Sequence, residues 1–292
     1  IFRVAPRINA AGRLGDANRS VELLTTMDSH RATELAHELD QENKRRQRIQ
    51  QSVLDDAMLK VNSVFKREKD KAIILGSRSW HPGVVGIVAS KIKEEFNRPA
   101  IIISFDENGN GKGSARSIKR LNLYDALSST QEHLETYGGH AMAAGLAIQE
   151  SNFDEFQSAF LSYADSMLSQ KDLIPSIFLD GTIQLADINQ RFMDFMKKLG
   201  PYGPGNMRPK FALMNVKVVG NPKVIGNGAH IRFQVKQNQS SIPVIGFGLA
   251  EYYQELILGQ PVDIAGVVET NVWKGKESIQ LNARDIRLSS SV

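Results

Sequence analysis

The chain has 292 residues, a formal net charge of +4 and a sequence pI of about 9.2. Single hydrophobic cores rarely serve chains beyond roughly 250–300 residues, so we expect at least two domains. The mild basic excess is compatible with a polyanionic partner without requiring one. The absence of cysteine excludes disulfides and cysteine-bound zinc, and no apolar run approaches the roughly 18 residues of a membrane-spanning helix. We expect a soluble, cytoplasmic protein without membrane association. Its opening, IFRVAPRINAAGRL, looks like the middle of a motif, which suggests a fragment.

The first long element is a predicted helix over residues 29–68, which contain neither proline nor glycine. Leucine, isoleucine and valine recur at helical spacing toward both ends. Between them, DQENKRRQRIQQ at 40–51 is polar on every side, which predicts a helix that crosses solvent between two packed bodies. A coiled coil is the alternative, although the apolar repeat breaks across this stretch.

An α/β domain is predicted over residues 69–170. KAIILGS and PAIIISF read as buried strands, and GVVGIVASKIKEEF between them reads as a helix with Pro82 in its first turn. This order predicts a βαβ unit. A glycine-rich hairpin then leads to SARSI, and helices are predicted over NLYDALSSTQEHLETY at 122–137 and around 153–168.

The pattern changes at residues 171–175. The remainder contains a helix in LADINQRFMDFMKKL, the turn-rich LGPYGPGNMRPKF and five strands, with the short helical segment AEYYQELIL between the third and fourth. This order matches an OB-type Greek-key barrel better than a sandwich. The expected fold is therefore an α/β body followed by a β-barrel.

The stretch GKGSARS carries a candidate phosphate grip. On a strand, alternation sends Ser114 and Arg116 to one face, where a hydroxyl and a planar guanidinium fork suit a phosphate. The alternative is an exposed strand with a solvated Arg116.

The stretch GGHAMAAGL removes side chains around a histidine. Gly138 and Gly139 permit close backbone approach, so a phosphate would lie against them with His140 as hydrogen-bond donor or proton carrier. The alternative is that Gly139 ends the preceding helix and His140 satisfies a backbone carbonyl.

Two further segments place polar groups beside small residues. In PRINAAGRL, Asn9 and Arg13 are spaced around alanines and a glycine, and Arg13 is a second candidate for a phosphate. In RSWHPG, Trp80 and His81 precede a helix N-terminus, a place suited to anions. Both are candidates for guiding a nucleic-acid strand, with Trp80 as a platform on which a base stacks. Trp80 in the core is the alternative.

The barrel supplies aromatic residues interleaved with basic ones. Arg232 precedes Phe233, and Trp273 precedes Lys274, a pattern that suits sequence-tolerant binding of a single strand. Phe233 in the barrel core is the alternative.

Metal ligands and catalytic pairs are missing from the pattern. The 6 histidines are scattered singly, and we find neither a nucleophile–base pair nor a dinucleotide glycine loop. The sequence predicts groups that bind substrate without the group that performs the chemistry.

Several motifs, in this order, resemble one family, the RecJ exonucleases of the DHH phosphoesterase superfamily: PRINAAGRL, SWHPGVVGIVASKIKEEF, FNRPAIII, GKGSARS, YGGHAMAAGL and LGPYGPGNMRPKF. The resemblance implies an enzyme that degrades single-stranded DNA from the 5′ end with Mn²⁺ or Mg²⁺. It implies metal ligands in a DHH domain before Ile1, so that this chain alone is inactive. It also implies the end of a DHH lobe at 1–28, a connecting helix at 29–68, a DHH-associated domain at 69–170 and an OB domain at 171–292. Met207, in GPGNMRP, departs from the family's usual proline.

The resemblance also implies roles for the candidate residues. His140 would face the scissile phosphate. The 5′ phosphate and backbone would be held by residues of three motifs, Asn9, Arg13, Ser114, Arg116, Gly138 and Gly139. The barrel would guide the strand.

The partners implied are single-strand-binding protein and a RecQ-type helicase, in recombination and repair, with the protein itself a monomer. Two alternatives stay open, an oligonucleotide or cyclic-dinucleotide phosphodiesterase of the same superfamily and a non-catalytic single-strand-binding module.

Overall fold

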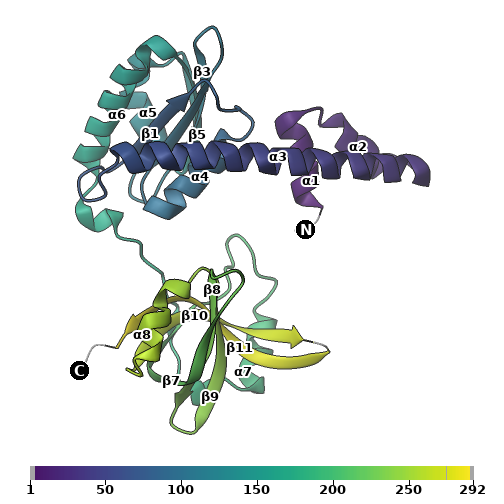
Figure 1. Ribbon diagram of the computed structural model, residues 1–292, viewed down its shortest axis with the longest axis vertical. Coiled ribbons are helices and arrows are strands. Elements are labelled where there is room, and N and C mark those ends of the chain that lie inside the picture. Colours follow the sequence, from purple (N-terminus) through teal and green to yellow (C-terminus); the bar gives the residue numbers. More distant parts are fainter. Residues whose placement is uncertain (1–3, 274, 290–292) are drawn as a thin grey trace. The chain divides into compact units, whose positions relative to one another are not determined.

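The computed structural model describes residues 4–273 and 275–289, without the side chains of Val64 and Trp273. The chain divides into two compact units, Ile1–Pro175 and Ser176–Val292, called here the α/β unit and the barrel unit (Figure 1). In the described ranges, no helix is both long enough and apolar enough to cross a membrane.

The α/β unit contains a three-helix segment and a five-stranded sheet with its helices. In chain order its elements are α1 (Ala5–Leu14), α2 (Asn18–Thr25), α3 (Ser29–Val64), β1 (Ile73–Ser77), α4 (Val85–Phe96), β2 (Ala100–Phe105), β3 (Asn110–Arg116), α5 (Leu123–Ser129), β4 (Thr136–His140), β5 (Ala143–Gln149) and α6 (Phe153–Met167). Short 3-10 turns lie at Gln131–His133, Glu150–Asn152 and Gln170–Leu173.

Helix α3 runs past both parts of the unit (Figure 1). The side chain of Asp28 caps its N-terminus by accepting a hydrogen bond from the His30 N–H. Leu35 and Leu39 are buried in its first half, where α1 and α2 contact it, and Val53, Ala57 and Val61 pack against β1 and α4 in its second half. The sequence suggested that the polar stretch 40–51 is solvated on every side. The structure corrects this, because Asn43 within it is only 6% exposed.

The sheet has the order β1-β2-β3-β5-β4, in which only β1 and β2 are parallel. The βαβ unit predicted from the sequence is therefore present. One face of the sheet packs against α3 and α4, through Ala100 and Ile102, and the other packs against α5 and α6, through Ile101 and Ile103. Strand β2 is buried along its whole length because helices cover both of its faces.

The structure corrects two expected helices. The helix predicted over 122–137 ends at Ser129, and residues 136–140 form the edge strand β4, because they pair in register with β5 from Thr136↔Ala147 to His140↔Ala143. Gly139 consequently lies within a strand and does not end a helix. Pro82 lies in a turn ahead of α4, which begins at Val85.

The elements of the barrel unit are β6 (Gly181–Thr182), α7 (Gln190–Lys198), β7 (Phe211–Ile225), β8 (His230–Gln237), β9 (Ser240–Gly246), α8 (Tyr253–Ile257), β10 (Val262–Trp273) and β11 (Lys276–Leu288), with 3-10 turns at Leu185–Asp187 and Ala250–Tyr252. The barrel consists of the five predicted strands, β7 to β11, and the two-residue strand β6 pairs with β7. The antiparallel meander β7-β8-β9 joins β11 through a parallel β9–β11 pair, and β10 pairs with both β11 and β7. This last pair closes the barrel around one apolar core.

Candidate phosphate-binding site and strand-binding surface

Ser114 and Arg116 lie together on β3, as alternation predicted. The Arg116 Nη1 donates to the Ser114 Oγ at 3.1 Å and to the Ala115 carbonyl at 2.7 Å. They face α4 at Gly86, where a Cβ would lie 3.0 Å from the Ser114 Oγ and 3.3 Å from the Arg116 Nη2. A glycine in α4 therefore leaves the room that these two side chains occupy.

Arg13 reaches the same region from the last turn of α1. Its Nη1 lies 3.4 Å from the Gly83 carbonyl oxygen, and a Cβ on Gly83 would lie only 2.1 Å from the Arg13 carbonyl oxygen. Gly83 and Gly86 thus bring α1 and β3 against one short segment at the start of α4. Burial lowers the pKa of Arg116, and the positive charge of Arg13 lowers it further, which indicates that the two guanidinium groups share one electrostatic environment.

Of the other residues predicted near this site, two lie close to Arg13 and one does not. Asn9 is exposed one turn before Arg13 on the same side of α1. His81 accepts a hydrogen bond from the Gly83 N–H at 3.0 Å and so lies beside the segment that Arg13 contacts. Trp80 corrects the sequence-based expectation, because it is 4% exposed and its indole N–H donates to Asp56 at 2.7 Å. Trp80 therefore belongs to the core and has no ring face at the surface on which a base could stack.

Sequence reasoning missed a third arginine. Arg46 extends from α3, and its guanidinium donates to the Gln50 Oε1 at 2.6 Å and to the Asn43 Oδ1 at 3.1 Å. Burial lowers the pKa of Arg46, and the positive charge of Arg13 lowers it further. Within the described ranges, none of the three arginines of this arginine cluster, Arg13, Arg46 and Arg116, forms an ion pair with a carboxylate.

Small residues beside the cluster form an open patch on the sheet. Arg116 is opposite Ala143, which is opposite His140, and Ser114 is opposite Gly145, which is opposite Gly138. Residues directly opposite each other in antiparallel strands project to the same face. The sheet floor, defined as Gly138, Ala143 and Gly145, therefore separates Ser114 and Arg116, called here the β3 grip, from His140.

The sheet floor has space above it. A Cβ on Gly138 would meet nothing within 4 Å, and one on Gly145 would meet only the Gly113 carbonyl at 3.8 Å. Two strand spacings place the α-carbons of Arg116 and His140 about 10 Å apart. His140 is exposed at the end of β4, and its imidazole makes no hydrogen bond or ion pair with any described residue. Gly139 has a φ of +143° and lies opposite Ala144, so it belongs to the other face of the sheet.

One more basic residue faces the same way. Lys112 is exposed two residues before Ser114, so its side chain lies on the same face of β3. It forms no ion pair with the rest of the described chain. The strand rise separates the α-carbons of Lys112 and Ser114 by about 7 Å. Lys112 therefore extends the row of polar and basic side chains on this face of β3 beyond Ser114 and Arg116, the two that the sequence predicted.

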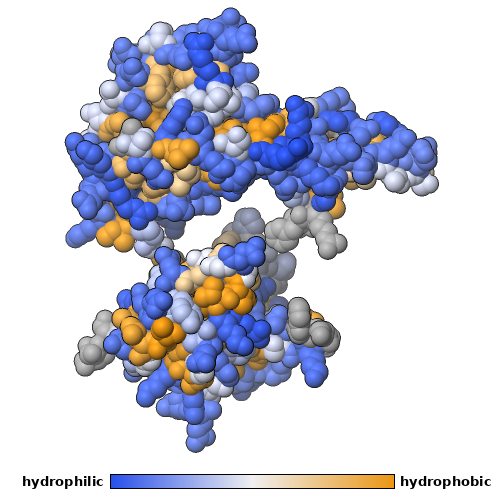
Figure 2. All heavy atoms as spheres, viewed as in Figure 1, coloured by the Kyte–Doolittle hydropathy of each residue, from blue (hydrophilic) through white to orange (hydrophobic). Residues whose placement is uncertain are grey.

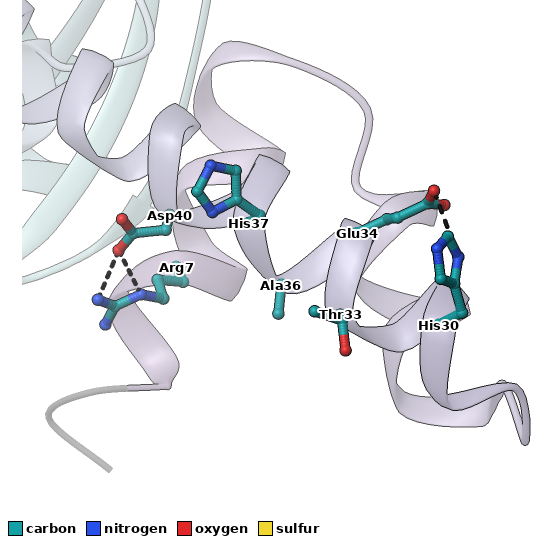
Figure 3. Close-up of a pocket in the computed structure, with 7 residues that line it drawn as sticks. All are labelled: Arg7, His30, Thr33, Glu34, Ala36, His37 and Asp40. Carbon is teal, nitrogen blue, oxygen red and sulfur yellow. Dashed lines mark hydrogen bonds and ion pairs between the residues drawn. The ribbon is translucent and has the colours of Figure 1, made fainter.

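A groove on the first half of α3 has a different character (Figure 3). There Arg7 binds Asp40, with 2.8 Å between Nε and Oδ1, and His30 lies 3.5 Å from Glu34. Lys44 also contacts Asp40 at 2.8 Å. Because carboxylates balance the cations in this groove, the arginine cluster is the better candidate for an anion.

The barrel expectations need correction. Phe233 is 5% exposed and packs in the barrel core, since it alternates with Arg232, which faces solvent. The side chain of Trp273 and the whole of Lys274 lie outside the described residues. The exposed phenylalanines of this unit are Phe178, Phe195 and Phe247, and Phe247, on the barrel, is 52% exposed and packs edge to face against His230 with ring centroids 5.2 Å apart. Apolar residues form patches on the surface of this unit (Figure 2).

The outer face of β7 and β8 is basic. The stretch from Phe195 to Ala250 contains no aspartate or glutamate. It carries eight basic residues, Lys197, Lys198, Arg208, Lys210, Lys217, Lys223, Arg232 and Lys236. Lys217 pairs with Lys236, and Lys223 pairs with Arg232, so four of these charges line adjacent strands. This stretch without acidic residues is a signal that the sequence alone carries.

Comparison with known proteins gives one consistent result. A family model described as the DHHA1 domain matches residues 69–166, and one described as the RecJ OB domain matches residues 179–285. The single-stranded-DNA-specific exonuclease RecJ of Bacillus subtilis (strain 168) is 35% identical over 290 residues, which are 99% of this chain and 36% of the relative. The corresponding protein of Haemophilus influenzae is 34% identical, over 96% of this chain and 50% of the relative.

Solved structures agree. RecJ of Thermus thermophilus in complex with Mg²⁺ has a TM-score of 0.82 at 32% identity, over 99% of this chain and 43% of that chain. The same protein with Mn²⁺ has a TM-score of 0.84 over 100% and 41%. This chain thus spans between about a third and half the length of these relatives. Its described residues include no group of three or more histidine, aspartate or glutamate side chains that could hold a metal ion.

Proposed function

We propose that this chain, which belongs to the RecJ family, forms the substrate-binding part of an exonuclease that degrades single-stranded DNA from the 5′ end. The observation that carries the proposal is the sheet floor, bordered on one side by Ser114 and Arg116 and on the other by His140. The chain by itself is expected to bind DNA without cutting it.

The 5′ phosphate binds at the β3 grip. Arg116 and Ser114 offer a planar donor fork and a hydroxyl, and Arg13 adds a second guanidinium from α1. A terminal phosphate monoester carries more negative charge than an internal phosphodiester, so this end of the strand is bound preferentially. The grip therefore sets the polarity of the enzyme.

The nucleotide backbone lies on the sheet floor. Gly138 and Gly145 present no side chain, so sugar and phosphate approach the sheet closely, and the following phosphate lies near His140. The imidazole donates a hydrogen bond to a nonbridging oxygen and stabilises the charge that develops during cleavage. Asn9 and Gly139 complete this part of the proposal, Asn9 as a donor beside Arg13 and Gly139 as the residue that lets β4 take its path.

The barrel guides the strand. Phosphates contact the basic face of β7 and β8, and the exposed Phe247, packed against the half-buried His230, offers a surface on which a base stacks. This contact reads charge and ring faces, so it tolerates any sequence. We assign the whole enzyme to recombination and repair, acting as a monomer with single-strand-binding protein and a RecQ-type helicase as partners.

The test of the site compares the same oligonucleotide with a 5′ phosphate and with a 5′ hydroxyl, by fluorescence anisotropy. The chain should bind the phosphorylated strand roughly tenfold more tightly, the order expected for one charge-assisted grip. Arg116→Gln should abolish this preference, and Arg120→Gln, a change at a side chain that is 75% exposed, should keep it. Equal binding of both strands by the unaltered chain would show that no 5′-phosphate site is formed.

The test of the enzymatic assignment adds Mn²⁺ and measures release of mononucleotides. A protein that carries the additional length of the relatives should degrade the strand, whereas this chain should only bind it. Degradation by this chain, with contaminating nucleases excluded, would contradict the substrate-binding assignment.

A further inference from the structure

The hairpin formed by β10 and β11 extends beyond the closed part of the barrel (Figure 1). Strand β10 pairs with β7 only as far as Gly266, and β11 pairs with β9 only at Leu281–Ala283. The distal part of the hairpin, residues 267–273 and 276–280, therefore pairs with no third strand of the described chain.

The core-facing side of the hairpin continues into this distal part. Val268 lies in the barrel core, and alternate residues of a strand project to the same face, so Thr270 and Val272 lie on this side as well. Val272 is nevertheless 61% exposed. Glu277 is directly opposite Val272 and shares its face. The distal hairpin thus presents a wall, partly apolar and partly acidic, that the barrel core leaves uncovered.

A cavity of about 400 Å³ lies between this wall, helix α7 and the turn that precedes β7. Its volume is in the range of roughly 300–1,000 Å³ that is typical of small-molecule sites. Val268 and Met193 of α7 form apolar parts of the lining, and Tyr202 of the turn adds an aromatic ring. All the lining residues belong to the barrel unit. We call this cavity the hairpin pocket.

The turn LGPYGPGNMRP fixes the position of its tyrosine. The Asn206 side-chain amide donates to the Leu199 carbonyl oxygen at 2.9 Å, where α7 ends. The Tyr202 hydroxyl donates to the Met196 carbonyl oxygen in the last turn of the same helix. These bonds tie the turn to α7, so the aromatic ring is in place before a ligand arrives.

A cation covers this ring. The Arg208 guanidinium lies over Tyr202, 5.0 Å from the ring centroid, at the distance of a cation–π contact. Arg208 is exposed and also lines the pocket, as do Lys197, Asp194 and Glu277. Neither cation forms an ion pair within the described ranges, although two carboxylates line the same cavity. Both positive charges therefore remain available to a ligand.

The lining distinguishes a base from a phosphate as the group inside the pocket. Asp194 and Glu277 would repel a phosphate there, whereas a nucleobase is neutral and carries N–H donors that carboxylates accept. The flat face of a base suits the pair of Tyr202 and Arg208. The phosphates on either side of that base would meet Lys197 and Arg208. A single nucleic-acid strand supplies this combination of neutral rings and flanking negative charges.

We propose that the hairpin pocket binds one base of the single strand, with its ring against Tyr202 and Arg208 and its flanking phosphates at Arg208 and Lys197. This inference rests on the proposed function and deepens it, because it gives the barrel a base subsite beside the basic face of β7 and β8. A strand is favoured over a segment of a protein partner because the stretch from Phe195 to Ala250 carries eight basic residues and no acidic one.

The experiment compares two 5′-phosphorylated strands of equal length, one made of deoxycytidines and one abasic throughout. The phosphates are the same, so the ratio of the two affinities reports the contribution of the bases. Affinities are measured by fluorescence anisotropy for the unaltered chain, Arg208→Ala and Arg191→Ala. Arg191 is an exposed arginine of α7 that does not line the pocket, and it is the matched control.

The unaltered chain should bind the deoxycytidine strand more tightly, and Arg208→Ala should lower the ratio roughly tenfold, the order expected for one stacked base. Arg191→Ala should keep the ratio. Tyr202→Leu keeps much of the bulk and removes the ring, so it should lower the ratio as Arg208→Ala does. A contact of Arg208 with phosphates alone would weaken binding of both strands equally and leave the ratio unchanged, which would overturn the inference.

Failure of the inference and failure of the proposed function give different results. A chain that binds neither strand, or that binds 5′-phosphorylated and 5′-hydroxyl strands equally, contradicts the proposed function. A chain that keeps the 5′-phosphate preference and shows the same ratio with and without Arg208→Ala contradicts only the base subsite. Phe247→Ala should lower the ratio further in the Arg208→Ala variant, because the two rings bind different bases. If thermal unfolding shows that Tyr202→Leu does not fold, the exposed Arg208 decides.

Discussion

Two adjacent glycines of β4 should respond in opposite ways to the same substitution. A Cβ on Gly138 would meet no heavy atom within 4 Å, whereas a Cβ on Gly139 would lie 2.5 Å from both the Ala143 carbonyl oxygen and the Ala144 Cα. Gly139 also has a φ of +143°, which residues with a side chain rarely adopt. Gly138→Ala therefore fits the present backbone, and Gly139→Ala requires β4 and β5 to move apart.

The two substitutions should change the free energy of unfolding by different amounts. Gly139→Ala combines a strained φ, which costs about 1–3 kcal/mol, with overpacking of a similar size, so the free energy of unfolding should fall by roughly 2–5 kcal/mol. Because 1 kcal/mol shifts the Tm by about 2–4 °C in a unit of this size, the Tm of the α/β unit should fall by at least about 4 °C. Gly138→Ala should change the free energy of unfolding little, or raise it by up to about 1 kcal/mol, because it restricts the unfolded chain.

Binding should separate the two positions again. Gly138→Val places a larger side chain on the sheet floor, so affinity for a 5′-phosphorylated strand should fall roughly tenfold while the Tm is kept. Gly181→Val, in the short strand β6, also adds a side chain where nothing lies within 4 Å, and it controls for the valine itself. Thermal unfolding by circular dichroism and anisotropy titrations are sufficient. A Gly138→Val variant that is as unstable as Gly139→Ala, or that binds like the unaltered chain, would refute the open floor.

Three further predictions concern the supports of the site and the barrel. Gly83→Ala places a Cβ 2.1 Å from the Arg13 carbonyl oxygen, so it should lower the Tm and weaken the 5′-phosphate preference, which a strand titration at a temperature below the transition would detect. Lys112→Gln should weaken binding of the 5′-phosphorylated and the 5′-hydroxyl strand equally, and it should reduce the slope of log affinity against log salt by about 0.7. A loss of affinity for only one of the two strands would contradict a contact between Lys112 and the DNA backbone. Phe247→Ala should weaken the free energy of strand binding by about 1–3 kcal/mol and leave the Tm unchanged. Phe233→Ala should lower the free energy of unfolding of the barrel by about 3–5 kcal/mol. The opposite pair of results would show that the exposed and buried rings were assigned wrongly.

The sequence predicted those elements whose apolar period is strong and local. The βαβ unit and the five barrel strands were expected because short apolar runs and turn signals delimit them. The helix expected over 122–137 was wrong at its second half because pairing with β5 decides the structure of Thr136 and Tyr137, and that pairing partner lies later in the chain. Local propensity carries no information on such a contact.

The site was predictable where it depended on alternation and missed where it depended on tertiary contacts. Ser114 and Arg116 share a face because they are two residues apart on a strand, whatever surrounds them. The same rule, applied to IRFQVKQ, would have assigned Phe233 to the core, since it alternates with Arg232 and Gln234. Arg46 could not be found in this way, because nothing in a polar helical stretch reveals which of its sides another helix covers.

The alternation of strands β4 and β5 explains why side chains are small on both faces of one motif. On one face, Ala144 packs in the core with α5 and α6, and Gly139 lies against β5, where a Cβ would be 2.5 Å from the Ala143 carbonyl oxygen and the Ala144 Cα. On the other face, Gly138 and Gly145 lie on the open side, where no neighbour restricts their size. Packing alone therefore requires small residues only on the first face. On the second face the fold would accept larger side chains, so packing does not explain the glycines there, whereas a ligand that lies on the sheet does. Ser114 and Arg116 at one border of this surface, and His140 without a partner among the described residues at the other, support the proposal that a phosphate-bearing strand lies there with its terminal phosphate at the arginines.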